Sequence, residues 1–274
     1  MRDQPLVRTD TGRDFIESLA RGLDVIRAFG RHPGQPVSLA QAAGATGLAR
    51  PTVRRILLTL EELGYVRSEG GRFTLTPRIL ELGLSYIAAS DIWTITRPHL
   101  EDLVRVTGES CSIAQLDGSD IIYVSRVAVA KLVTLSVTIG TRFPAPPTSL
   151  GKVLLAALDD DELHRVLDLP SRSAVRPTWR PTDSEIMIEI ENTRRRGWAA
   201  TDQQLAPAIR SVAAPIRNPD GTVLAAANVN AHAMETSMET LIGEHLPRLL
   251  EATAAIEQDL ARLAQVPLAT VQPR

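Results

Sequence analysis

The chain has 274 residues, enough for two domains, and its 44% hydrophobic and 23% charged residues are ordinary for a globular protein. No apolar run approaches the roughly 18 residues of a membrane span, and the first residues are polar rather than a hydrophobic leader, so we expect a cytoplasmic protein without a membrane partner. The net charge of −2 is uneven: twelve arginines and eight acidic residues give +4 to residues 1–80 and leave −6 for the rest, a distribution typical of a DNA-binding domain joined to a second domain.

The start of the chain predicts a polar tail followed by a helix. Residues 1–14 are polar, and we expect them to be disordered. The next segment, SLARGLDVIRAF from Ser18, has apolar side chains at helical spacing and predicts an amphipathic helix. We expect the inward face of this helix to consist of Leu19, Leu23, Ile26 and Phe29.

Residues 38–66, SLAQAAGATGLARPTVRRILLTLEELGYV, predict a short helix, a tight turn and a longer helix. Ser38 is a good N-cap for the first helix. Gly44 and Gly47 bracket the break after it. Pro51 suits the first turn of the second helix, where its missing N–H costs nothing. The apolar residues that follow repeat at i, i+3, i+4 and i+7 until a glycine stops the helix, so this helix has one buried face.

The opposite face of the longer helix carries arginines. Two such helices alone are equally compatible with an ordinary helical hairpin whose arginines are solvated. The next segment, YVRSEGGRFTL over residues 65–75, predicts two strands joined by a Gly-Gly turn. Helix, turn, helix and hairpin form a winged helix-turn-helix, which binds double-stranded operator DNA through the start of its second helix and through the wing. The predicted DNA-binding residues are Ser38, Arg50, Pro51, Thr52, Arg54, Arg55, Thr59, Arg67 and Arg72.

The rest of the chain predicts a linker helix and a mixed domain. The linker helix covers residues 77–90. Strands are predicted over residues 112–127 around an Asp-Gly turn, over residues 131–139, and on both sides of the turn at residues 218–221. Helices are predicted over residues 92–107, over residues 149–158 with Ser149 as N-cap, from residue 159, over residues 183–197 and over residues 239–264. An antiparallel sheet with helices at its ends makes an α+β domain, placed at residues 91–265 before a tail of residues 266–274.

Three segments in order resemble the IclR family of bacterial transcription regulators. The helix from Ser18 resembles the family's opening helix. GTRFPAPPTSLGKVLLA from Gly140 resembles its effector-domain signature, and GWAATDQQL from Gly197, followed by RSVAAPI from Arg210, resembles a second. The likeness covers residues 15–265 and is nearest to the branch that regulates protocatechuate, 4-hydroxybenzoate and the β-ketoadipate pathway.

The resemblance implies a winged helix-turn-helix domain at residues 15–76 and a GAF-like effector-binding domain, in a homodimer or homotetramer. Two departures from the family lie beside the expected effector pocket. The family often has glycine where this chain has Ala208, and Pro146 and Pro147 replace a more usual pair such as Tyr-Ala.

A small carboxylate effector, most simply an aromatic acid, needs a cation or a helix N-terminus for its charge and an apolar slot for its ring. Arg142 offers the cation, and the helix that starts after the Pro-rich loop offers free N–H groups. The alternative is that Arg142 only forms an ion pair with Asp202 and that the asparagines face solvent. The predicted effector-binding residues are Arg126, Arg142, Thr148, Ser149, Leu150, Gly151, Asp202, Asn228 and Asn230.

The sequence offers no catalytic constellation. Cys111 is the single cysteine, which excludes a disulfide framework, and its apolar surroundings predict a buried structural thiol. The five histidines lack metal-ligand spacing, and no phosphate loop, nucleophile elbow or paired-carboxylate motif occurs, so we expect no metal, no cofactor and no enzyme. The sequence therefore predicts a DNA-binding transcription regulator controlled by a small carboxylate. The alternatives are a DNA-targeted enzyme acting on a small acid and an effector-independent DNA-binding protein.

Overall fold

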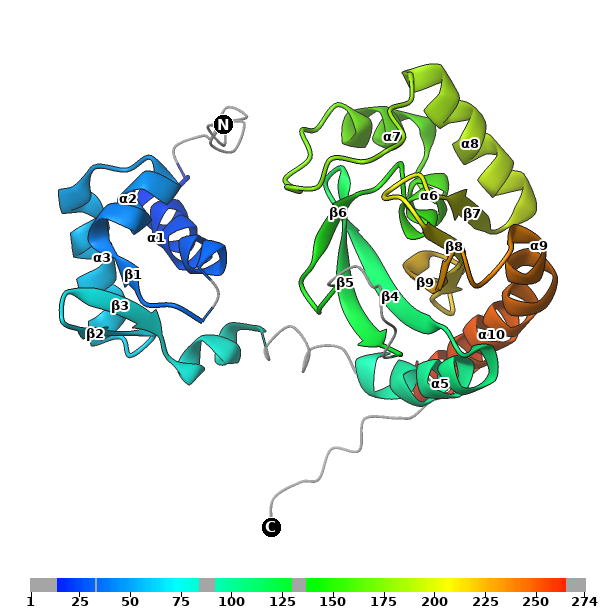
Figure 1. The fold of residues 1–274 in the computed structure, drawn as a ribbon, viewed down its shortest axis with the longest axis horizontal. Helices are drawn as coiled ribbons and strands as arrows, with labels where there is room; N and C mark the ends of the chain where they lie inside the picture. The colour runs from blue at the N-terminus through cyan, green and yellow to red at the C-terminus, as the bar shows by residue number, and fades with distance from the viewer. Residues whose placement is uncertain (1–13, 33, 84–91, 130–136, 265–274) are drawn as a thin grey trace, which may run out of the picture. The chain divides into compact units, whose positions relative to one another are not determined.

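A computed structural model describes residues 14–32, 34–83, 92–129 and 137–264 of the protein. The chain divides into two compact units, Met1–Ser90 and Asp91–Arg274, and each is described by itself (Figure 1). Within the described ranges, no helix is both long and apolar enough to cross a membrane.

The first unit is a winged helix. Its helices are α1 (Glu17–Ala28), α2 (Leu39–Thr46) and α3 (Arg50–Glu62), with a 3₁₀ turn at Phe29–Arg31. Its strands are β1 (Val37–Ser38), β2 (Val66–Glu69) and β3 (Arg72–Leu75), which form an antiparallel sheet in the order β1-β3-β2. The predicted winged helix-turn-helix fold of this unit is confirmed.

Local capping explains where α2 and α3 begin and end. Ser38 caps α2 in a full capping box with Gln41, as its side chain predicts. Gly47 ends α2 with a φ of 69°, a left-handed conformation that favours glycine. Gly44, by contrast, lies inside α2, so the prediction that it borders the break is wrong. Pro51 stands in the first turn of α3 as expected.

The predicted inward face of α1 is half right. Ile26 and Phe29 belong to the core as predicted, whereas Leu19 and Leu23 are 61% and 42% exposed. Val25 and Ala28 are buried but were not predicted. Only the C-terminal half of α1 packs on the core, which is built from Val25, Phe29, Val37, Ala42, Ala43, Val53, Leu57, Leu60, Val66 and Phe73, with Ile26 half-buried against it. Helical spacing alone does not reveal which turns of a helix meet a neighbour.

Two sequence predictions lie mainly outside the described residues. The predicted linker helix starts as a 3₁₀ turn, Pro77–Ile79, and stays helical to residue 83, where the described range ends. The strand predicted over residues 131–139 is described only from residue 137, and there the backbone is a turn, not a strand. The Thr138 N–H donates to the Thr141 side-chain oxygen (2.9 Å) and Gly140 has a φ of 86°, so this end of the prediction is wrong.

The second unit is built on a six-stranded antiparallel sheet in the order β6-β5-β4-β9-β8-β7. The strands are β4 (Ser110–Asp117), β5 (Asp120–Val127), β6 (Arg142–Pro144), β7 (Ala199–Asp202), β8 (Ile209–Arg217) and β9 (Val223–His232). The pairs β4–β5 and β8–β9 match the sequence prediction. The edge strands β6 and β7 were not predicted, because three or four residues are too few to show alternation. The α+β fold class is confirmed.

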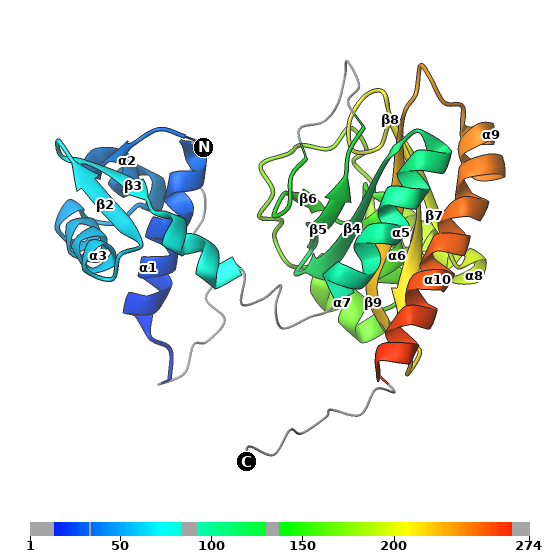
Figure 2. The ribbon, with the colours of Figure 1, turned by 90° about the horizontal axis from the view of Figure 1, so that it is seen from below.

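Helices cover both faces of this sheet rather than its ends, which corrects the sequence expectation (Figure 2). One face packs against α5 (Ile92–Thr107) and α10 (Leu246–Ala264), and the other against α6 (Ser149–Ala156) and α8 (Asp183–Arg196). The remaining helices are α7 (Asp160–Leu167) and α9 (Met238–Thr240), the latter followed by a π turn at Leu241–His245. Strand β9 supplies alanines to both faces, and these small side chains let helices pack on both sides.

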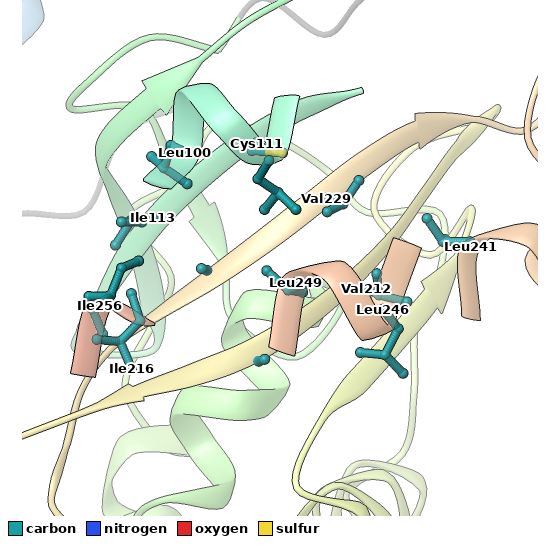
Figure 3. Packing of buried hydrophobic residues seen from close by; sticks show 14 of the residues in the cluster. Leu100, Cys111, Ile113, Val212, Ile216, Val229, Leu241, Leu246, Leu249 and Ile256 are labelled. Atoms are coloured by element: carbon teal, nitrogen blue, oxygen red, sulfur yellow. The ribbon is translucent and has the colours of Figure 1, made fainter. Parts of the chain in front are cut away.

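Cys111 lies within the core beneath α5 and α10 (Figure 3). Its side chain is fully buried, and burial raises the pKa of the thiol to about 12. Because the thiolate is the reactive species, this cysteine is inert at neutral pH. The expectation of a buried structural thiol is confirmed.

The N-terminus of α6 depends on a close backbone contact. Thr148, not Ser149, is the N-cap, because the Thr148 side-chain oxygen accepts the N–H of Gly151 (2.9 Å). The carbonyl of Ala145 accepts the Thr148 hydroxyl (2.9 Å), which fixes the loop against the helix. A Cβ on Gly151 would overlap the backbone of Ala145, so only glycine fits there.

We therefore expect Gly151→Ala to lower the free energy of unfolding by about 3 kcal/mol or more, at the upper end for overpacked sites, as measured by urea denaturation. Gly243→Ala serves as a control in the same unit, because a Cβ there meets nothing within 4 Å. The control is expected to be neutral or slightly stabilising. An equal effect of the two substitutions would show that the contact at Ala145 relaxes freely.

Candidate nucleic-acid interface and ligand pocket

The exposed side of α3 carries arginines without internal partners. Val53 and Leu57 bury the other side of this helix in the core. Arginines of α1 in the same unit form ion pairs with acidic residues close to them in the chain; for example, the Arg21 guanidinium lies 2.8 Å from the Glu17 carboxylate. Among the described residues, no hydrogen bond or ion pair engages the guanidinium groups of the exposed arginines of α3 and β2, so these groups are available for phosphates or base edges. These arginines are Arg50, Arg54, Arg55 and Arg67.

The wing is held firmly beside α3. Gly70 and Gly71 form its tip with φ values of 57° and 76°, as a two-residue hairpin turn requires. The Ser68 N–H donates to a carboxylate oxygen of Glu61 at the end of α3 (3.0 Å). Arg72 is exposed and donates to the carbonyl of Pro36 (3.3 Å). The wing arginines therefore occupy fixed positions relative to the helix.

The other predicted DNA-binding residues have roles within the helices. The Ser38 side-chain oxygen accepts the N–H of Gln41 (3.2 Å), and the Thr59 hydroxyl donates to the carbonyl of Arg55 (2.9 Å). Pro51 is exposed and Thr52 is half-buried at the start of α3. The structure thus brings all nine predicted residues into one unit and leaves the guanidinium groups of Arg50, Arg54, Arg55 and Arg67 without partners among the described residues, whereas Arg72 already donates to Pro36.

The second unit has a pocket between the start of α6 and the sheet. Its cavity volume is about 20 Å³, room for one water molecule, so a larger ligand must displace part of the lining. The lining contains no charged side chain. It consists of Tyr123, Pro147, Thr148, Ser149, Thr201, Leu205, Ile209, Ser211, Asn228 and Asn230. Of the predicted effector-binding residues, Thr148, Ser149, Asn228 and Asn230 are therefore brought together.

Strand alternation directs the two asparagines into the pocket. Ala227 and Val229 of β9 face α5 and α10, so Asn228 and Asn230 lie on the opposite face, toward α6. Asn230 pairs across the strands with Ser211 of β8. The alternative that the asparagines face solvent is wrong for Asn228, which is only 2% exposed.

Three hydroxyls link α6 to the sheet. Ser149 Oγ lies 2.7 Å from Ser211 Oγ, which lies 2.8 Å from Thr201 Oγ1. All three side chains are buried, so each hydroxyl satisfies its neighbour. This chain fixes the first turn of α6 above β8 and β7.

The first turn of α6 has two backbone donors without acceptors among the described residues, one of them on Ser149, which lines the pocket. The N–H groups of Ser149 and Leu150 have no hydrogen-bond acceptor in the part of the chain that the structure describes, as expected for the first residues of a helix. The N–H groups of Gly151 and Lys152 are already bonded to Thr148. Gly151 therefore supports the loop instead of offering a donor, which corrects its predicted role. The side chain of Leu150 is fully buried in the core.

Arg142 and Asp202 lie outside the pocket, on opposite edges of the sheet. Arg142 in β6 forms ion pairs with Asp117 and with Asp120, the latter at 3.3 Å. Asp202 in β7 pairs with Arg210 at 2.7 Å, a contact that lowers the pKa of Asp202. The alternative pair of Arg142 with Asp202 is therefore wrong, because four strands separate them.

Arg126 lies next to the pocket face without lining it. It is paired across the strands with Ser112, which is paired in turn with Asn228, so the three side chains share one face of the sheet. Arg126 donates to Ser112 Oγ (3.0 Å) and is half-buried, and this burial lowers the pKa of its guanidinium. Arg126 thus lies on the same face of the sheet as the asparagines, one strand beyond Ser112.

Sequence reasoning missed several lining residues. Tyr123 is buried, and burial raises the pKa of its hydroxyl to about 12, against the nearby charge of Arg126, which lowers it. Thr201 and Ser211 lie in the second family signature, and strand pairing places them opposite each other. Alternation along β8 would have identified Ser211 once its partner strand was known. The remaining missed residues are Pro147, Leu205 and Ile209.

A strained loop borders the pocket between β7 and β8. Gln203 and Ala208 have φ values of 55° and 62°, the only non-glycine residues with positive φ in the described ranges. The Gln203 side chain accepts the N–H of Ala208 (3.0 Å), and the Gln203 N–H donates to the carbonyl of Ile209 (2.7 Å). The position at which the family resemblance implies glycine is therefore one where the backbone favours it.

A winged-helix unit with uncommitted arginines and a second unit with a polar pocket define a two-domain, DNA-binding transcription regulator. Residues 18–70 match the IclR helix-turn-helix domain, and residues 84–258 match the bacterial transcriptional regulator IclR C-terminal domain. The chain belongs to the IclR family of bacterial transcriptional regulators.

Individual relatives agree with this assignment. The Pca regulon regulatory protein of Pseudomonas putida is 38% identical over 244 residues, covering 88% of this chain and 82% of that protein, which confirms the predicted branch. A transcriptional regulator from Rhodococcus sp. RHA1 superposes with a TM-score of 0.77 at 44% identity, covering 91% and 100% of the two chains. An IclR homologue from Microbacterium hydrocarbonoxydans, solved with 4-hydroxybenzoate, has a TM-score of 0.76 at 23% identity, covering 89% and 99%.

We expect Ala208→Gly to stabilise the protein. Removing a left-handed alanine recovers about 1–2 kcal/mol of strain, offset by the greater freedom of glycine in the unfolded chain, about 0.4–1 kcal/mol. The melting temperature should rise by roughly 1–4 °C. Ala206→Gly, in the same loop but without positive φ, is the matched control and should lower it. A lower melting temperature for Ala208→Gly would show that the alanine side chain makes contacts that outweigh the strain.

Proposed function

We propose that this regulator is controlled by a small aromatic carboxylate bound in the pocket at the start of α6. The observation that carries the proposal is that the uncharged pocket is lined by Ser149, whose N–H, like that of the adjacent Leu150, has no hydrogen-bond acceptor among the described residues. Such N–H groups attract anions, and the helix dipole adds to the attraction. Pro147, Leu205 and Ile209 supply the apolar slot that a ring needs.

The relatives support an aromatic acid. The homologue from Microbacterium hydrocarbonoxydans was crystallised with 4-hydroxybenzoate, and the Pseudomonas putida relative regulates a Pca regulon. Of the predicted effector-binding residues, the pocket lining retains Thr148, Ser149, Asn228 and Asn230 as the direct candidates. Arg126 adds positive potential to the same face of the sheet.

The start of α3 and the wing form the proposed operator contacts. Arg50, Arg54 and Arg55 would reach base edges and phosphates in the major groove, and Arg67 and Arg72 would contact the backbone beside it. A homodimer or homotetramer would present two recognition helices to successive major grooves of a roughly palindromic operator. Because the target is chromosomal DNA, the protein would act in the bacterial cytoplasm.

We expect Arg54→Ala combined with Arg55→Ala to weaken operator binding at least about 10-fold at fixed salt and to reduce the salt dependence by about two counterions. The measurement is a titration of a duplex selected by the wild-type protein from a random library. Arg21→Ala combined with Arg27→Ala is the matched control, because it removes the same charge from exposed but ion-paired sites in α1. Equal losses in the two double variants would contradict a specific role for α3.

We expect 4-hydroxybenzoate and 3,4-dihydroxybenzoate to raise the melting temperature of the full chain and to change its operator affinity. An effector at 100 times its Kd adds about 2.7 kcal/mol of stability, a shift of several degrees. The corresponding benzamides keep the ring but lose the charge, and they should shift neither quantity. The absence of any shift with aromatic acids would contradict the effector assignment and favour an effector-independent regulator.

A further inference from the structure

The pocket contains a buried oxygen without a hydrogen-bond partner. Asn228 is 2% exposed, and its side-chain Oδ1 has no partner among the described residues. Leaving such an acceptor unpaired costs free energy, so an orphan in a binding pocket marks a place where the ligand supplies the missing donor. The same residue lines the pocket at the start of α6.

The unpaired atom of Asn228 is its amide oxygen. An amide oxygen is an acceptor, so the group that is missing beside it is a donor. The nearby hydroxyls of Ser149, Ser211 and Thr201 bond to one another and do not satisfy this oxygen.

Two polar groups of the pocket have opposite requirements. The Ser149 N–H at the start of α6 is a donor, which suits an anionic carboxylate. Asn228 Oδ1 is an acceptor and repels a carboxylate, but it suits a hydroxyl proton. A ring that carries both an acid and a hydroxyl can satisfy both groups and place its apolar face on the apolar side chains of the same lining.

We propose that Asn228 is a specificity-determining residue that accepts a hydrogen bond from a ring hydroxyl of the effector and so selects hydroxylated aromatic acids over unhydroxylated ones of the same shape. This inference rests on the proposed function of the pocket. A site built to bond a hydroxyl rejects an analogue without it, because the buried oxygen is then left unpaired.

The test is isothermal titration calorimetry of the full chain with 3,4-dihydroxybenzoate and with 3,4-difluorobenzoate, which has a similar shape but no hydroxyl proton. The wild-type protein is expected to bind the dihydroxy acid about 10- to 100-fold more tightly. In Asn228→Leu, which keeps the volume but removes the acceptor, this ratio should fall to within about 3-fold, with the difluoro acid bound at least as tightly as by the wild type.

Asn230→Leu is the matched control, two residues along the same strand and in the same pocket. Asn228 Oδ1 is among the buried atoms without a partner, and Asn230 Oδ1 is not. Asn230→Leu should therefore keep the wild-type ratio of the two affinities, dihydroxy acid over difluoro acid, even where both affinities change. The wild-type ratio itself needs no variant, so the proposal is testable even if Asn228→Leu does not fold.

The outcomes separate this inference from the function it rests on. Equal binding of both acids by the wild type overturns the role of Asn228 and leaves an aromatic-acid pocket intact. A wild-type preference that persists in Asn228→Leu also overturns it, because the hydroxyl is then recognised elsewhere. Binding of neither acid overturns both proposals.

Discussion

The close approach of Gly151 to the carbonyl of Ala145 is the contact on which the pocket depends. It fixes the Pro-rich loop against α6 and leaves Thr148 as the cap, so the first turn of the helix is placed above the sheet with two N–H groups unused. The neighbouring hydroxyl chain then ties this turn to β8 and β7. A pocket without charged side chains can therefore still attract an anion, because the backbone supplies the donors.

Because side chains alternate between the two faces of the sheet, the same strand contributes to the core and to the pocket. Along β9, one set of residues closes the core under α5 and α10, and the set between them supplies the polar floor of the pocket. A one-residue slip in the register would exchange the two sets and bury the asparagines among leucines. The alanines of this strand are thus constrained from both sides, by the packing of two helical layers and by the need to hold Asn228 and Asn230 in place.

The sequence predicted local features well and spatial relations poorly. The capping box at Ser38, the glycine turn of the wing and the position of Pro51 were predictable because they depend on residues close in the chain. The pairing of Asp202 with Arg210, rather than with Arg142, was not, because it depends on strand order across the sheet. Six of the ten lining residues were absent from the predicted set for the same reason. Asn228 was found because an amide inside an apolar strand is conspicuous in any register.

The hydroxyl chain of Ser149, Ser211 and Thr201 has a further consequence. In each of its two links either oxygen can be the donor, so the chain can run in either direction without moving a heavy atom. In one direction Ser149 presents a lone pair at the start of α6, and in the other it presents a proton. The Ser149 hydroxyl can therefore change from acceptor to donor by proton rotation alone, so a ligand at the start of α6 would meet either polarity without any movement of heavy atoms.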